Sequence, residues 1–133
     1  MESEPEHERL SRYIESCRDD VCDADVGERL EELERLSESA EDRTDPDDLN
    51  ALSTLGNPTR HRILRLLDES DGDLCVCEIE PVVDVSQSGV SHALSDLTDA
   101  GLVERRREGR WRFYTATRLG ESLLGALDSE AER

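Results

Sequence analysis

The chain has 133 residues and a formal net charge of −18, and all 16 of its basic residues are Arg. This length fits one domain with an additional arm, and no apolar run approaches the roughly 18 residues that would span a bilayer. The acidic N-terminus lacks the apolar segment of a signal peptide, so we expect a cytoplasmic protein without membrane contact, whose thiols stay reduced.

So acidic a composition without Lys is typical of halophilic archaea, because concentrated salt shortens the Debye length to about 3 Å at 1 M and screens self-repulsion. An acidic, partly disordered protein is the alternative. The charge is also uneven: residues 1–48 hold 19 acidic residues and 6 Arg, whereas residues 103–118 hold 6 Arg and 2 Glu. A basic segment in an acidic chain indicates a nucleic-acid contact rather than only a solvated hairpin.

The predicted N-terminal arm, residues 1–44, is acidic and helical. Leu10, Tyr13 and Ile14 predict one turn of amphipathic helix. Residues 26–40 predict a longer helix, because apolar residues recur at helical spacing opposite a face of Glu and Arg. This helix could pack on a partner or be a plain core helix, and its narrow apolar stripe fits a dimer seam or a lid equally well.

Two cysteines, Cys17 and Cys22, lie in this arm. So hydrophilic a segment rarely needs Cys for packing, since free Cys is usually a buried residue. We therefore interpret the pair as functional, with incidental thiols on a flexible arm as the alternative.

Two helices are predicted next along the chain. Asp45 followed by Pro46 is a helix-start signal, because Asp caps free amides and Pro needs no donor at the first position. Gly56 ends this helix. Pro58 starts the second helix, whose wide apolar stripe continues to about Asp68.

A short extended segment and two further helices follow. Residues 73–76 are expected to be extended and to lead into a short helix over residues 77–83. Pro81 fits this helix only near its first turn, because it lacks an amide donor. Ser86 is a good N-cap for the helix that begins at Gln87.

The last part of the chain predicts a hairpin and a helix. Gly101 ends the preceding helix, and residues 102–106 and 111–115 then predict two strands joined by a tight turn at Gly109. Thr117 is positioned to cap a last helix with regularly spaced Leu residues.

Two helices with a short turn and a basic hairpin describe a winged helix-turn-helix. We therefore predict an α+β, mainly α fold, with a DNA-binding domain over residues 45–118 and a C-terminal dimerisation helix over residues 119–133. The second helix would present polar side chains to base edges, and the Arg residues of the wing would reach phosphates. The predicted DNA contacts are Ser86, Gln87, Ser88, Ser91, His92, Arg105, Arg106, Arg107 and Arg110.

Cys75 and Cys77 precede the predicted reading helix. Thiolates select soft ions such as zinc, cadmium, lead, copper(I) and trivalent arsenic or antimony. If the two cysteines lay on a regular helix, their side chains would point about 200° apart, because they are two residues apart. Both can bind one ion only where the chain is extended or entering a helix, and this pair lies at such a junction. Binding should then reshape the helix start and misplace the reading helix.

Four motifs, in this order and at these spacings, resemble the ArsR/SmtB family of winged-helix repressors that respond to metals and metalloids. They are LSTLGNPTR at residues 52–60, LCVCE at 74–78, SQSGVSHAL at 86–94, and GLV at 101–103 leading to REGRWRFY at 107–114. The resemblance covers about residues 49–118. It implies a homodimer that represses its own operon and leaves operator DNA when metal binds.

The resemblance implies arsenite, antimonite or a soft divalent ion (Cd, Pb, Zn) as effector, bound at Cys75 and Cys77. The best-known arsenite pattern of the family has a third Cys three residues further on, where this chain has Glu80. Family members with a cysteine-bearing arm add two arm cysteines, often from the other subunit. This would bring Cys17 and Cys22 to the site.

Two other functions compete with the metal-responsive repressor, which has no catalytic residue and is not an enzyme. One is a winged-helix regulator that answers to thiol oxidation. The other, from a different class, is a thiol redox protein or metal carrier. It would leave the Arg-rich wing unexplained, and the chain has no Cys-x-x-Cys beside a βαβ pattern.

Overall fold

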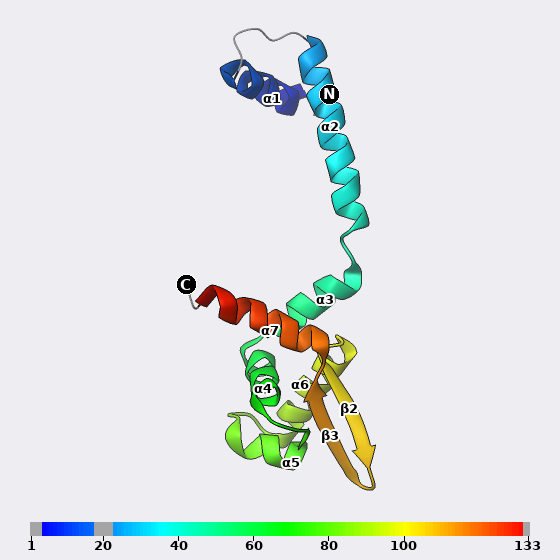
Figure 1. Ribbon diagram of the computed structural model, residues 1–133, viewed down its shortest axis with the longest axis vertical. Helices are drawn as coiled ribbons and strands as arrows, with labels where there is room; N and C mark the ends of the chain where they lie inside the picture. The colour runs from blue at the N-terminus through cyan, green and yellow to red at the C-terminus, as the bar shows by residue number, and fades with distance from the viewer. Residues whose placement is uncertain (1–3, 18–22, 132–133) are drawn as a thin grey trace. The chain divides into compact units, whose positions relative to one another are not determined.

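The computed structural model describes residues 4–17 and 23–131 of the chain. The chain forms two compact units, Met1–Thr44 and Asp45–Arg133 (Figure 1). Within the described residues, every helix is too short or too polar to cross a membrane.

The N-terminal unit contains α1 (Glu4–Cys17) and α2 (Asp23–Asp42). The helix predicted over residues 26–40 is confirmed as α2. The single turn predicted near the N-terminus is too short, because α1 has 14 residues. Glu and Arg are good helix formers, and Glu8 and Arg12 pair across one turn at 4.0 Å, so the polar sequence sustains the helix without a wide apolar stripe.

The second unit begins with two capped helices, α3 (Pro46–Leu55) and α4 (Pro58–Glu69). The predicted cap at Asp45 is confirmed, since its carboxylate accepts a 2.8 Å hydrogen bond from an amide of the first turn. Asn57 caps α4 in the same way at 3.1 Å. These caps satisfy amides that have no partner within the helix.

The segment that holds the two cysteines folds as β1 (Leu74–Cys75), α5 (Val76–Ile79) and the 3₁₀ helix η1 (Glu80–Val82). A short helical stretch is thus present where one was predicted over residues 77–83, but it begins one residue earlier and is divided into an α-helical turn and a 3₁₀ turn. Pro81 lacks an amide hydrogen and lies in the first turn of η1, where an amide has no partner within the helix.

The predicted reading helix is confirmed as α6 (Gln87–Asp99). Its N-cap is Ser86, whose hydroxyl accepts a 3.1 Å hydrogen bond from the amide of Gly89. It ends at Gly101, where φ of +78° is a left-handed conformation that favours glycine.

The predicted hairpin is confirmed as β2 (Val103–Glu108) and β3 (Trp111–Ala116), paired antiparallel around a turn at Gly109. It forms a wing that projects from the helices of this unit (Figure 1). A feature that the sequence did not predict is that β1 adds to the free edge of β3, which gives a sheet of order β1-β3-β2.

The last helix, α7 (Arg118–Ala131), is tied to the base of the wing. The Thr117 hydroxyl accepts from the amide of Gly120 at 3.2 Å, as predicted for a cap, and donates to the carbonyl of Gly101 at 2.7 Å. A Cβ atom at Gly120 would lie 2.6 Å from the Leu102 carbonyl oxygen, so α7 approaches the wing closely only because residue 120 is glycine.

One apolar core joins these elements. Side chains from the helices and the start of the wing are fully enclosed, so α5, α6 and the β2–β3 wing are held as a winged helix-turn-helix, in agreement with the predicted fold class. The fully buried residues of largest volume are Ile63, Leu64, Ile79, Val90, Leu94, Leu97, Leu102, Val103 and Leu124.

Candidate functional site

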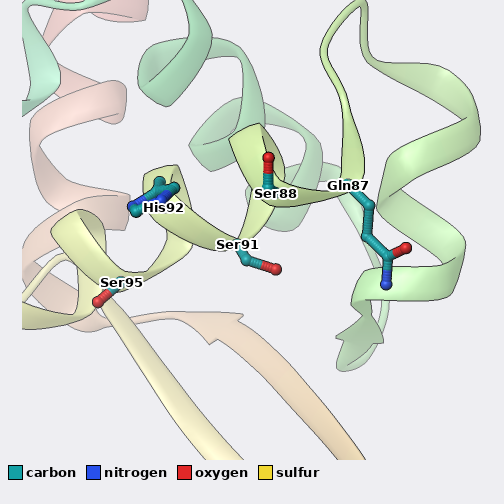
Figure 2. A pocket seen from close by; sticks show the side chains of 5 residues that line it. All are labelled: Gln87, Ser88, Ser91, His92 and Ser95. Atoms are coloured by element: carbon teal, nitrogen blue, oxygen red, sulfur yellow. The ribbon is translucent and has the colours of Figure 1, made fainter.

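The exposed face of α6 forms a polar surface, which we call the reading face. It borders a hollow of about 530 Å³ lined by Gln87, Ser88, Ser91, His92 and Ser95 (Figure 2). Four of these were predicted as DNA contacts. Ser95 was not, although its spacing of four from Ser91 places it on the same helix face.

The side chains of the reading face point in different directions. Figure 2 shows Gln87 and Ser91 directed to the lower side of α6, Ser88 directed to the upper side, and Ser95 again on the lower side, further along the helix. Ser86 precedes this row, and its hydroxyl already accepts from the Gly89 amide and lies 3.2 Å from the Ser88 hydroxyl. DNA contact by these residues stays a prediction.

The predicted basic residues of the wing differ in their surroundings. Arg106 donates to the carboxylates of Asp73, at 2.9 Å, and Glu108, and its guanidinium lies 4.8 Å from the Phe113 ring centroid. Hydrogen bonds to Glu108 and Asp73 raise the pKa of Arg106. Its charge is thus offset locally, so it offers less net positive potential to a phosphate.

The other three predicted wing contacts are freer. Within the described part of the chain, no ion pair involves the exposed side chains of Arg105, Arg107 or Arg110. These residues, together with the exposed Arg112 of β3, therefore carry uncompensated positive charge on the wing.

The two cysteines of the second unit converge, as their position at a strand-to-helix junction predicted. Cys75 has extended backbone angles (φ −93°, ψ 164°), and Cys77 lies in the first turn of α5. Their sulfur atoms form a disulfide across a Cα–Cα distance of 5.3 Å. Both sulfurs thus reach one point, and reduction of this bond would leave a dithiol directed at the same place.

The surroundings of the two cysteines leave one side open to a ligand. Cys75 is buried, with 6% of its surface exposed, whereas Cys77 is exposed. The Cys75 amide donates to the Glu78 carboxylate at 3.0 Å, which fixes the start of α5. A ligand therefore meets the pair from the side of Cys77.

A complete protein-ligand set is not assembled around the pair. Within residues 4–17 and 23–131, no three side chains of His, Cys, Asp or Glu are grouped so that they could hold one ion. The side chain of Cys17 and the whole of Cys22 lie outside the described residues. Among the described residues, the two sulfur atoms of Cys75 and Cys77 are thus the soft groups brought together.

A second hollow, which we call the shared cavity, lies between the two cysteines, helix α6 and the wing. It has a volume of about 240 Å³. One wall is the segment from Cys75 to Cys77, a second is formed by Gln87 and Ser91 of α6, and a third by Arg110, Trp111 and Arg112 of the wing. Sequence reasoning did not find this cavity, because its walls meet only through tertiary packing.

The pairing of β1 with β3 attaches the cysteine segment to the wing. Cys75 lies opposite Phe113 in this pairing. The ion pair between Asp73 and Arg106 and the position of Arg106 over the Phe113 ring reinforce it from β2. A change at the thiols is therefore connected through backbone hydrogen bonds to the strand that carries the wing.

The position of α6 also depends on α4. Arg60 donates to the Asp96 carboxylate at 2.9 Å, and its backbone amide is the donor to the Asn57 cap. The sequence placed Arg60 at the start of α4 but did not reveal this partner, which lies 36 residues away.

Comparison with known protein families and curated proteins gives consistent results. A family model described as "Bacterial regulatory protein, arsR family" matches residues 57–105. The chain is 47% identical, over 91% of its length and 94% of the relative's, to a protein of Halobacterium salinarum named as a candidate arsenical resistance operon repressor, ArsR. This relative is consistent with the halophile composition.

Two solved structures are also similar. One, described as a possible transcriptional regulator for arsenical resistance, has a TM-score of 0.51 and 34% identity over 61% of this chain and 82% of that one. The other, from Mycobacterium bovis, is described as a homodimeric winged helix-turn-helix DNA-binding domain. It has a TM-score of 0.55 and 29% identity over 65% of this chain and 78% of that one.

Proposed function

This chain belongs to the ArsR family of DNA-binding transcriptional regulators, and we propose that it represses an arsenical resistance operon. In this proposal the reduced protein binds operator DNA and leaves it when an effector binds the cysteine thiolates. The effector is arsenite or antimonite, or a soft divalent ion such as Cd, Pb or Zn. Because a repressor acts on the chromosome, we place the protein in the cytoplasm.

The observation that carries this proposal is the shared cavity. Two converging sulfur atoms line the same hollow of about 240 Å³ as residues of the reading helix and of the wing. Soft metalloids and metals bind thiolates in preference to oxygen or nitrogen ligands. An effector at this position therefore lies next to both DNA-binding elements.

DNA binding is assigned to the reading face and the wing. Helix α6 presents amide, hydroxyl and imidazole groups that can donate to or accept from base edges in the major groove. The uncompensated charges of Arg105, Arg107 and Arg110 serve phosphate binding, which is the main source of affinity for DNA. Residues 45–118 form the DNA-binding domain in this proposal.

Dimerisation is assigned to α3 and α7. Four large apolar side chains on these helices are about half exposed, and we propose that together they form an apolar surface that a partner covers. They are Leu49, Leu52, Leu119 and Leu127. A second copy of the chain is the proposed partner, which makes residues 119–133 part of the dimer contact.

The N-terminal arm is proposed to complete the site for divalent ions. Cadmium and lead prefer more than two soft ligands, and the described residues provide only Cys75 and Cys77 in one place. Cys17 and Cys22 are the remaining cysteines of the chain. They would act with the thiols of Cys75 and Cys77, from the same or the other subunit.

An electrophoretic mobility shift with the DNA upstream of the gene tests the function. The full-length protein is reduced with a phosphine, which does not bind arsenite as a thiol reductant would, and is titrated in concentrated salt. We expect a specific complex that arsenite dissociates. Salt must be kept constant, because phosphate binding weakens steeply as salt rises.

Three outcomes would contradict the proposal. Failure to bind the upstream DNA at any salt concentration would exclude the repressor. Binding that no ion reverses, but that an oxidant such as hydrogen peroxide reverses, would replace metal sensing with thiol oxidation. Release by cadmium but not by arsenite or antimonite would remove the link to arsenical resistance.

A further inference from the structure

We propose that Gln87 and Ser91 bind the effector as well as DNA, so that arsenite and the operator compete for the same two side chains. This inference rests on the proposed function. It goes further by naming the groups that recognise the oxygen of a trivalent oxyacid once two thiolates hold its arsenic atom.

The two hollows beside α6 share only part of their walls. Gln87 and Ser91 line both the hollow of the reading face and the shared cavity. Ser88, His92 and Ser95 line the first hollow only. In Figure 2 the side chains of Gln87 and Ser91 point to the same side of α6, and that of Ser88 points to the opposite side.

The chemistry of a two-thiol site leaves one oxygen on the metalloid. Arsenous acid, As(OH)₃, reacts with the reduced pair to form two As–S bonds and break two As–O bonds. The two thiol protons leave with the two hydroxides as water. Arsenic stays trivalent and keeps one hydroxyl group, so the step needs no oxidant, and the only prior requirement is reduction of the disulfide by a phosphine or a cellular thiol.

The retained hydroxyl needs partners that both donate and accept. A glutamine amide and a serine hydroxyl do both, whereas the guanidinium groups of Arg110 and Arg112 in the same cavity only donate. Gln87 and Ser91 therefore suit a neutral As–OH group best. They also compensate for Glu80, which stands where a third cysteine would have replaced this hydroxyl.

Competition follows from this sharing. A side chain that hydrogen-bonds the As–OH group is turned into the shared cavity and is not available to a base edge. Release of DNA would then come from direct occupation of two reading residues, in addition to any shift of α6 itself.

Trp111 provides the measurement. It is the single Trp of the chain, lines the shared cavity and is about half exposed. Its fluorescence should therefore report arsenite binding to reduced, full-length protein without DNA. We expect Gln87→Ala and Ser91→Ala each to weaken arsenite binding roughly threefold to tenfold, as expected for loss of one hydrogen bond.

Two controls separate this effect from others. His92→Ala should leave arsenite binding unchanged while weakening DNA binding, because His92 lines the reading face only. Phenylarsine oxide forms the same two As–S bonds but keeps a phenyl group in place of the hydroxyl. Its affinity should therefore be the same for the wild type and for the Gln87 and Ser91 variants.

The outcomes distinguish this inference from the proposed function. Wild-type arsenite affinity in the Gln87→Ala, Ser91→Ala double variant would overturn the inference and leave the repressor intact. Equal weakening of arsenite and phenylarsine oxide would also overturn it, since the two residues would then act on the thiols and not on the hydroxyl. If the wild type binds no arsenite, the proposed effector itself is wrong.

Discussion

Helix α6 borders two hollows that are built in different ways. The hollow of the reading face is lined by five polar residues of one helix, within nine positions of each other in the sequence. The shared cavity is built from three separate segments, with two sulfur atoms on one wall and the wing on another. The surface that we propose to read DNA is thus local in sequence, whereas the proposed effector cavity exists only in the folded chain.

The largest expected effect is a loss of the arsenite response without a loss of DNA binding. Replacing both Cys75 and Cys77 by Ser removes the soft ligands but keeps the size of the side chains. Arsenite should then no longer release the DNA. We expect arsenite affinity to fall by more than the roughly 10–100-fold that removal of a residue supporting a metal ligand costs. Mobility shifts should show DNA affinity close to that of wild type, since neither residue lines the reading face.

The cysteines of the arm provide the matched comparison. Cys17→Ser with Cys22→Ser should weaken the response to cadmium and leave the two-thiol response to arsenite in place. A cadmium response that survives this change intact would show that the arm takes no part in the site.

The next effect concerns the packing of α7 against the base of the wing. Gly120→Ala places a Cβ atom 2.6 Å from the Leu102 carbonyl oxygen, so α7 or the base of the wing must move. We expect the free energy of unfolding to fall by about 1–3 kcal/mol, as in other overpacked cores. Thermal or denaturant unfolding of the purified variant in concentrated salt measures this loss.

Gly125→Ala is the control in the same helix. Open space surrounds the position of its added Cβ atom, so relief of the helix penalty of glycine should stabilise the protein by up to about 1 kcal/mol. Similar stability changes for both variants would mean that α7 does not approach the wing as described.

A smaller effect compares arginines within the wing. Arg105→Ala and Arg107→Ala should each weaken DNA binding for all sequences alike and reduce the slope of log affinity against log salt by about 1. Arg106→Ala should change this slope less, because Asp73 and Glu108 already offset its charge. Equal slopes for all three variants would show that Arg106 binds phosphate as the sequence predicted.

The smallest effect concerns the ion pair between α4 and α6. Arg60 and Asp96 are both partly exposed, so a double-mutant cycle with Ala should give a coupling of no more than about 1 kcal/mol in unfolding experiments. A coupling well above this would mean that the pair holds α6 more firmly than its exposure indicates.

Local signals explain most of what the sequence predicted. Asp45, Ser86 and Thr117 each cap a helix by bonding to an amide within a few residues, and Gly101 adopts a positive φ, so these boundaries depend on neighbours alone. The convergence of Cys75 and Cys77 was predictable for the same reason.

Non-local contacts account for what the sequence did not reveal. Residue Cys75 pairs with Phe113, and Arg106 reaches Asp73, 33 positions earlier in the chain. Nothing in a two-residue extended segment specifies which strand it will join. The shared cavity depends on this pairing, which is why Gln87 and Ser91 were predicted as DNA contacts but not as neighbours of the thiols.

The central claim is that the effector and the operator exclude one another at α6. Fluorescence anisotropy of labelled upstream DNA, with phosphine-reduced protein at fixed salt, tests it most directly. We expect saturating arsenite to lower DNA affinity by at least about fivefold and, by linkage, saturating DNA to lower arsenite affinity by the same factor. Arsenite that binds the protein, as Trp111 fluorescence would report, yet leaves DNA affinity unchanged would contradict the account.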